Sequence, residues 1–141
     1  MDLRTLPRDV PGRLVAGAMI LNAGLGKRNA DPQTAAGLHG MAAGTYPVLA
    51  SQEPQAFARK LSAAEIALGA ALLTPFVPTV VAGAALTAFS AGLLGLYLRT
   101  PGMRKEGSLA PTQDGLAVAK DVWMLGIGVG LVVDALGRRR R

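Results

Sequence analysis

The residue best placed to carry chemistry is Glu65, a carboxyl group at the edge of a long uncharged stretch. Residues 66–98 contain no charged side chain, and Glu65 directly precedes them. A carboxylate buried without a partner is costly, so Glu65 must meet a cation or hold a proton. On a helix, the neighbours three and four residues away are all uncharged: Leu61, Ser62, Leu68 and Gly69. The partner must therefore come from another helix.

Two lysines are candidate partners for Glu65, namely Lys27 and Lys120. Asp121 directly follows Lys120 and would share the same network, and Asn22 is a candidate hydrogen-bond donor close to Lys27 in sequence. Such a cluster has two interpretations. It is either a clamp between helices that fixes their packing, or a site for a proton or a quinone head group.

Arg13 and Asp134 form a second candidate pair, because they open and close two predicted antiparallel helices at similar depth. Gly126 and Gly130 have the four-residue spacing that lets two helices approach closely, so we expect helix packing there. The alternative for these glycines is a glycine-rich helix without a packing role. The VAGA segment occurs at 15–18 and again at 81–84, which we interpret as a product of the Ala- and Gly-rich composition.

The sequence restricts cofactor chemistry because it has no cysteine and a single histidine, His39. Thiolate catalysis, cysteine-held iron–sulfur clusters and a haem with two histidine ligands from one chain are therefore excluded. We expect no metal and no intrinsic cofactor, and the sequence assigns no catalytic residue.

The elements that position these residues are predicted to be membrane helices. Half of the 141 residues are hydrophobic and 17% are charged, against about 25% charged in an average soluble domain. The apolar residues form blocks rather than a periodic pattern, which favours a membrane protein. The uncharged stretch is too long for one bilayer crossing of roughly 20 residues and too short for two. The TPFVP segment at 74–78 therefore predicts a hairpin of two helices that reaches back past Glu65.

We predict one all-α membrane domain over residues 1–141, built as a four-transmembrane-helix bundle. The first loop contains an interfacial or re-entrant helix that breaks near Pro47. A basic tail closes the chain at residues 137–141. The predicted spans are 12–27, 58–74, 79–98 and 116–136.

The net charge of +6 is best explained by basic residues at the ends of spans rather than by nucleic-acid binding. Four spans place both termini on one side, and the arginine run at 138–141 predicts that this side is cytoplasmic. The same run would attract anionic membrane lipids. We therefore expect a multi-pass membrane protein, with lipid as a partner.

Several short segments resemble the DoxX-like family of bacterial integral membrane proteins. They are RLVAG at 13–17, GLGK at 24–27, and KLSAAE at 60–65 followed by Gly69. The four-span plan with a long first loop is also similar. The sequence departs from the family in having Met19 and Ile20 where an aromatic residue is usual in the first span.

The resemblance implies a location in the bacterial plasma membrane and a function in membrane redox chemistry. Some relatives are described as the small membrane subunit of a thiosulfate:quinone oxidoreductase, and others are linked to oxidative-stress complexes in actinobacteria. We therefore expect an anchor or assembly partner of a bacterial redox or oxidative-stress complex, inactive alone and bound to a protein of that complex. The alternatives are a quinone-interacting oxidoreductase subunit, for which quinone would be the ligand, and a small proton-coupled transporter. A homo-oligomer is an alternative assembly.

Overall fold

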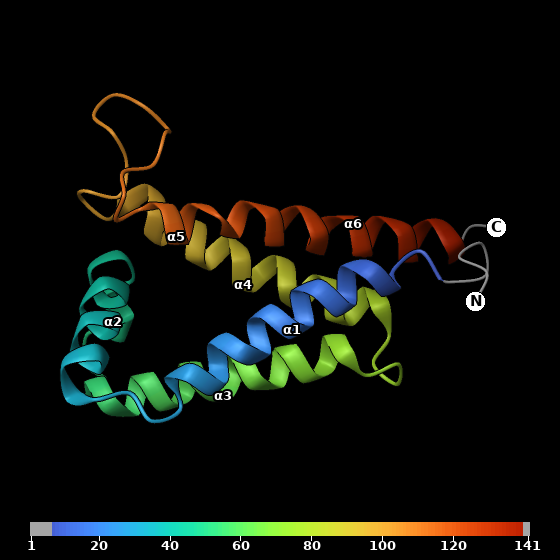
Figure 1. The fold of residues 1–141 in the computed structure, drawn as a ribbon, viewed down its shortest axis with the longest axis horizontal. Helices are drawn as coiled ribbons and strands as arrows, with labels where there is room; N and C mark the ends of the chain where they lie inside the picture. Colours follow the sequence, from blue (N-terminus) through green and yellow to red (C-terminus); the bar gives the residue numbers. More distant parts are fainter. Residues whose placement is uncertain (1–6, 140–141) are drawn as a thin grey trace.

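The computed structural model describes residues 7–139 of the chain. All regular secondary structure in that range is helical (Figure 1), apart from one isolated β-bridge between Arg104 and Pro111. The elements are α1 (Val10–Lys27), α2 (Pro32–Thr45), the 3₁₀ helix η2 (Pro47–Leu49), α3 (Pro54–Leu73), α4 (Thr79–Arg99), α5 (Leu116–Ala119) and α6 (Asp121–Arg139).

The four long helices α1, α3, α4 and α6 lie close to the four predicted segments. α3 begins earlier than predicted, at Pro54, because Glu53 caps it. The Glu53 carboxylate accepts hydrogen bonds from the backbone N–H groups of Gln55 and Ala56, at 2.9 and 2.8 Å. These two bonds lower the pKa of Glu53 below its usual value. The fourth segment is interrupted at Lys120, between α5 and α6.

The predicted helix of the first loop is present as α2 and ends before Pro47. Asp31 caps its start, where the carboxylate accepts hydrogen bonds from the backbone N–H and the hydroxyl of Thr34, both at 2.9 Å. At its other end, Tyr46 reaches α4 and donates its hydroxyl proton to the Gly92 carbonyl at 2.8 Å. α2 is therefore attached to the rest of the protein.

Within residues 7–139, two helical segments are long and apolar enough to cross a membrane. They are α4 and the 24 residues Leu116–Arg139, which comprise α5 and α6. Only 22% and 11% of their most apolar stretches are buried inside the protein. In a soluble domain, a helix that is apolar on all sides is buried in the core. These two helices instead present most of their apolar surface outward.

The long helices pack as two antiparallel pairs, α1 with α3 and α4 with α6 (Figure 1). The pairs meet at the end that holds the α3–α4 turn and the two ends of the described chain, and they diverge toward the opposite end. α2 lies at that diverging end, where it contacts α3 and α4. The buried core joins both pairs and consists of Ala16, Ile20, Leu68, Leu72, Ala82, Leu86 and Leu131.

Glycines set the close approach within the first pair. A Cβ atom at Gly69 would lie 2.7 Å from the backbone nitrogen of Leu21, and one at Gly24 would lie 2.9 Å from that of Ile66. At the same seam, the Ser62 hydroxyl donates to the Gly24 carbonyl at 2.7 Å. Any larger side chain at either glycine would therefore push α1 and α3 apart.

In the second pair, the close contact is made by Gly128 rather than by the predicted Gly126 and Gly130. A Cβ atom at Gly128 would lie 2.8 Å from the backbone nitrogen of Thr87 in α4. Gly126 and Gly130 are exposed, and a Cβ atom at either would meet nothing within 4 Å in the described part of the chain. Positions two residues apart lie on nearly opposite faces of a helix, so the predicted pair faces away from α4.

This difference predicts opposite effects for neighbouring glycines. We expect Gly128→Ala to destabilise the protein by about 1–3 kcal/mol, because its new methyl group meets the Thr87 backbone. Gly126→Ala is the matched control and should leave stability equal or slightly higher, since alanine favours helix. Thermal unfolding of the detergent-solubilised protein, followed by circular dichroism, measures both. Equal melting of the two variants would contradict the assigned α4–α6 contact.

Candidate functional site

The structure places Lys27, the last residue of α1, against Glu65 in the middle of α3. The Lys27 ammonium donates to both Glu65 carboxylate oxygens, at 3.1 and 3.2 Å, and to the Ala23 carbonyl at 3.4 Å. The Glu65 side chain is 5% exposed and that of Lys27 is 26% exposed. Antiparallel packing of α1 and α3 creates this contact, because it brings the end of one helix beside the interior of the other.

The other predicted members of this cluster take different positions. The half-buried Asp121, at the start of α6, lies close enough for its charge to interact with Glu65 and Lys27. Lys120 and Asn22 are exposed, and neither shows a side-chain hydrogen bond or ion pair to another residue between 7 and 139. The fold thus joins Lys27 to Glu65 by a direct ion pair, whereas Asp121 belongs to this cluster only through its charge, without a hydrogen bond or ion pair to either residue.

This cluster holds two carboxyl groups and one ammonium group. Glu65 is neutralised by Lys27, whereas Asp121 forms no ion pair within the described residues. A site with one carboxyl group in excess can reach neutrality by taking up a proton or a cation. The arrangement therefore combines a clamp between α1 and α3 with one group that is available for protonation.

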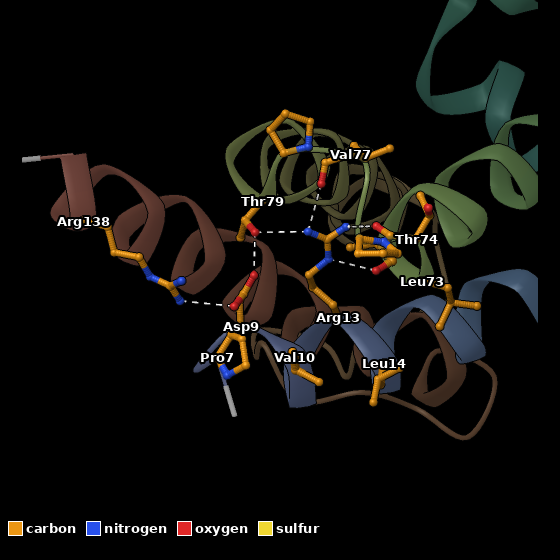
Figure 2. Close-up of a pocket in the computed structure, with 13 residues that line it drawn as sticks. Pro7, Asp9, Val10, Arg13, Leu14, Leu73, Thr74, Val77, Thr79 and Arg138 are labelled. Carbon is orange, nitrogen blue, oxygen red and sulfur yellow. Dashed lines mark hydrogen bonds and ion pairs between the residues drawn. The ribbon is translucent and has the colours of Figure 1, made fainter. Parts of the chain in front are cut away.

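At the opposite end of the bundle, Arg13 is buried and anchors the end of α3. All five N–H groups of its guanidinium donate hydrogen bonds, at distances of 2.6–3.0 Å. Figure 2 shows those to Thr74, Val77 and Thr79. Two acceptors are carbonyls of the last turn of α3, which a helix leaves without partners. The others belong to the α3–α4 turn and the start of α4. The five acceptors are the carbonyl oxygens of Ala71, Leu72, Thr74 and Val77 and the hydroxyl of Thr79.

Arg13 does not pair with Asp134, contrary to the prediction from the sequence. Asp134 accepts instead from Arg138, one turn further along α6. Arg13 is linked to acidic residues indirectly: the Thr79 hydroxyl that accepts from it donates to Asp9 at 2.5 Å, and Arg138 donates to Asp9 at 3.1 Å. Backbone carbonyls therefore take the place that a carboxylate was expected to fill.

Asp9 is the member of this network that sequence reasoning missed. Burial raises its pKa, but hydrogen bonds from Thr79, from its own backbone N–H and from Arg138 bring the net pKa below the usual value. Asp9 occupies the cap position before α1, yet its side chain does not cap that helix. Its place just before a helix that begins Val-Pro was the available signal, and that signal indicated capping rather than a link to α4 and α6.

His39 serves a structural contact in α2. Its Nε2 atom lies 2.8 Å from the Leu49 carbonyl oxygen, and its ring packs edge-on against Phe57 with centroids 5.5 Å apart. Within residues 7–139, no group of three or more His, Asp or Glu side chains is placed to hold a metal ion.

No protein-family model, curated protein or solved structure matches this chain. The resemblance to the DoxX-like family accordingly stays a prediction. The two polar clusters must be interpreted from their own geometry.

The Arg13 geometry predicts that charge alone cannot replace the guanidinium. Arg13→Lys keeps the positive charge but offers three donors to five acceptors. Buried acceptors left without donors cost about 1–3 kcal/mol each, so we expect a loss of at least about 2 kcal/mol in unfolding free energy. Arg59→Lys, at an exposed position of α3, is the control and should unfold like the original protein. Denaturant unfolding in detergent compares the two, and equal stability would contradict the anchoring role.

The Lys27–Glu65 contact predicts non-additive substitutions. Lys27→Met leaves Glu65 buried without its cation, and we expect a loss of about 2–3 kcal/mol, at the low end for buried pairs because Lys27 is partly exposed. The double variant Lys27→Met/Glu65→Leu should be more stable than Lys27→Met alone, because no unpaired carboxylate remains. Lys60→Met, on the exposed face of α3, is the control. If the loss of unfolding free energy in the double variant equalled the sum of the losses in Lys27→Met and Glu65→Leu, a direct contact would be contradicted.

Proposed function

We propose that this chain is an integral protein of the bacterial plasma membrane that crosses the bilayer four times. Its role is that of an anchor or assembly partner for a membrane redox complex. One observation carries the membrane part of the proposal, namely the uncharged outer surface of the four long helices. The redox part rests on the DoxX-like resemblance.

The outward-facing residues of all four long helices form an uncharged belt. In the segments 14–26, 61–73, 79–98 and 122–137, every exposed residue is uncharged. Large apolar side chains stand out from this belt, with Met19, Trp123 and Val133 between 63% and 69% exposed. Helices of 18 to 21 residues span about 27–32 Å at 1.5 Å per residue, close to the roughly 30 Å of a bilayer core.

Charged side chains border the belt at both ends. At the diverging end, the exposed residues include Arg59, Lys60 and Arg99, and at the other end they include Arg8 and Arg139. Basic residues are typical of the borders of membrane spans. Clustered arginines support a cytoplasmic location for the end that holds Arg8 and Arg139. The sequence adds Arg4, Arg140 and Arg141 to this cluster, and these three lie outside the described residues.

The internal use of both polar clusters supports a structural role. All five N–H groups of Arg13 and both carboxylate oxygens of Glu65 are engaged within the chain. Groups committed in this way hold helices together and are not offered to a substrate. We therefore infer that the protein works through a partner in the membrane.

A second candidate function is favoured by Asp121. The surplus carboxyl group, whose charge interacts with those of Lys27 and Glu65, fits a proton-handling site, as a quinone-interacting subunit or a proton-coupled transporter would need. A quinone site here requires that Glu65→Gln or Asp121→Asn abolish quinone binding to the purified protein. Unchanged binding in both variants would exclude it.

Single cysteines in this cysteine-free chain test the membrane proposal. Ala67 in α3 and Ala88 in α4 are not covered by any other part of the chain between residues 7 and 139. A cysteine at either position would therefore react freely in water but would be shielded in a bilayer. We expect Ala67→Cys and Ala88→Cys to resist a membrane-impermeant maleimide in membranes and to react after detergent is added. Asp114→Cys and Phe76→Cys, at exposed sites, should react from opposite sides. Free labelling of Ala67→Cys in membranes would remove the four-span proposal.

A further inference from the structure

A cavity of about 370 Å³ lies beside the Arg13 network, at the end where α1, the α3–α4 turn and α6 meet (Figure 2). One part of its wall is apolar and includes Val10, Leu14 and Leu73, and another part is polar and includes Asp9 and Arg138. A smaller hollow of about 200 Å³ borders Arg138 on the side of Thr79, Val80 and Arg139. Arg138 therefore lines both hollows.

The charges around these hollows favour an anion. Arg13 contributes positive charge to the wall, but all its donors are used inside the chain. Arg138 uses Nη2 for its bonds to Asp9 and Asp134, which leaves Nε and Nη1 without a partner among residues 7–139, and its side chain is 49% exposed. Arg139 is exposed next to it. The charged residues at this end are thus three arginines, Arg13, Arg138 and Arg139, and two aspartates. Both aspartates, Asp9 and Asp134, already accept hydrogen bonds from Arg138.

The position of the hollows specifies which anion fits. If the chain spans the membrane as proposed above, the cavity lies where the uncharged belt ends, at the level of lipid head groups. Leu14 and Val15, the first belt residues of α1, are 52% and 60% exposed and would contact acyl chains. Arginine binds phosphate oxygens through paired N–H donors, and basic pockets between membrane helices hold anionic head groups.

We propose that the cavity between α1, the α3–α4 turn and α6, together with the adjoining smaller hollow, binds the phosphodiester head group of an anionic phospholipid. Arg138, which lines both, and Arg139, which lines the smaller hollow, are its donors. The acyl chains would lie along the apolar side of the cavity, against Leu14 and Leu73. This inference rests on the proposed membrane location but goes beyond it, because it assigns one lipid class to one site.

Native mass spectrometry of the purified protein in mild detergent, titrated with phosphatidylglycerol or phosphatidylcholine, tests this site. We expect phosphatidylglycerol to bind more tightly, and Arg139→Gln to weaken that binding about tenfold, as the loss of one charge-assisted hydrogen bond does. Arg138→Gln should weaken it at least as much. Arg59→Gln, an exposed arginine at the other end of α3, is the matched control and should bind as the original protein does. Arg139→Gln is the main variant because Arg139 takes no part in the Asp9 network.

Three results would overturn the lipid site. They are equal binding of the two lipids, equal loss in Arg139→Gln and Arg59→Gln, and displacement of phosphatidylglycerol by millimolar inorganic phosphate, which would indicate a free-anion site. Alkaline carbonate extraction of membranes distinguishes failure of the lipid site from failure of the membrane proposal. A chain that resists extraction but does not prefer phosphatidylglycerol refutes the lipid site alone, whereas an extracted chain refutes the four-span proposal.

Discussion

The buried guanidinium of Arg13 is the interaction on which the rest of the arrangement depends. α3 ends at Leu73, before a turn that contains Pro75 and Pro78, and prolines supply no backbone N–H. The carbonyls at the end of α3 therefore lack donors within their own segment. Arg13 supplies these donors from α1, and the bonds through Thr79 and Asp9 extend the network to α4 and α6. One side chain thereby joins all four long helices at one end of the bundle.

Beside its apolar core, the bundle buries two charged side chains and exposes large apolar ones. Glu65 and Arg13 are buried, 4% and 8% exposed, while Trp123 is 69% exposed. Inside the bundle, the charged groups meet partners on other helices, so their burial is compensated. Along the belt, every exposed residue is uncharged. In the proposed bilayer location, packing between helices would rely on glycine contacts and internal hydrogen bonds, because lipid gives no further gain from burying apolar surface.

Much of the helix pattern could be predicted from the sequence, because uncharged blocks and prolines mark where helices run and stop. Lys27 could be named as a candidate partner of Glu65, since opposite charges near one end of antiparallel helices are within reach. The partners of Arg13 could not be found, because a comparison of side-chain charges ignores backbone carbonyls. The packing face of α6 could not be predicted either. Gly126, Gly128 and Gly130 are equivalent in sequence, and only the position of α4 shows which of them makes the contact.

The two VAGA segments, 15–18 and 81–84, occupy equivalent places in the two helix pairs. Ala16 and Ala82 are both in the core, at 0% and 1% exposed. Their neighbours Gly17 and Gly83 each contact a leucine of the partner helix, Leu72 or Leu73 for Gly17 and Leu131 for Gly83. Each half of the chain is thus a helical hairpin of similar design with its own seam. All five acceptors of Arg13 lie between residues 71 and 79, so the first hairpin holds every partner that its buried arginine needs and can form this network without α6.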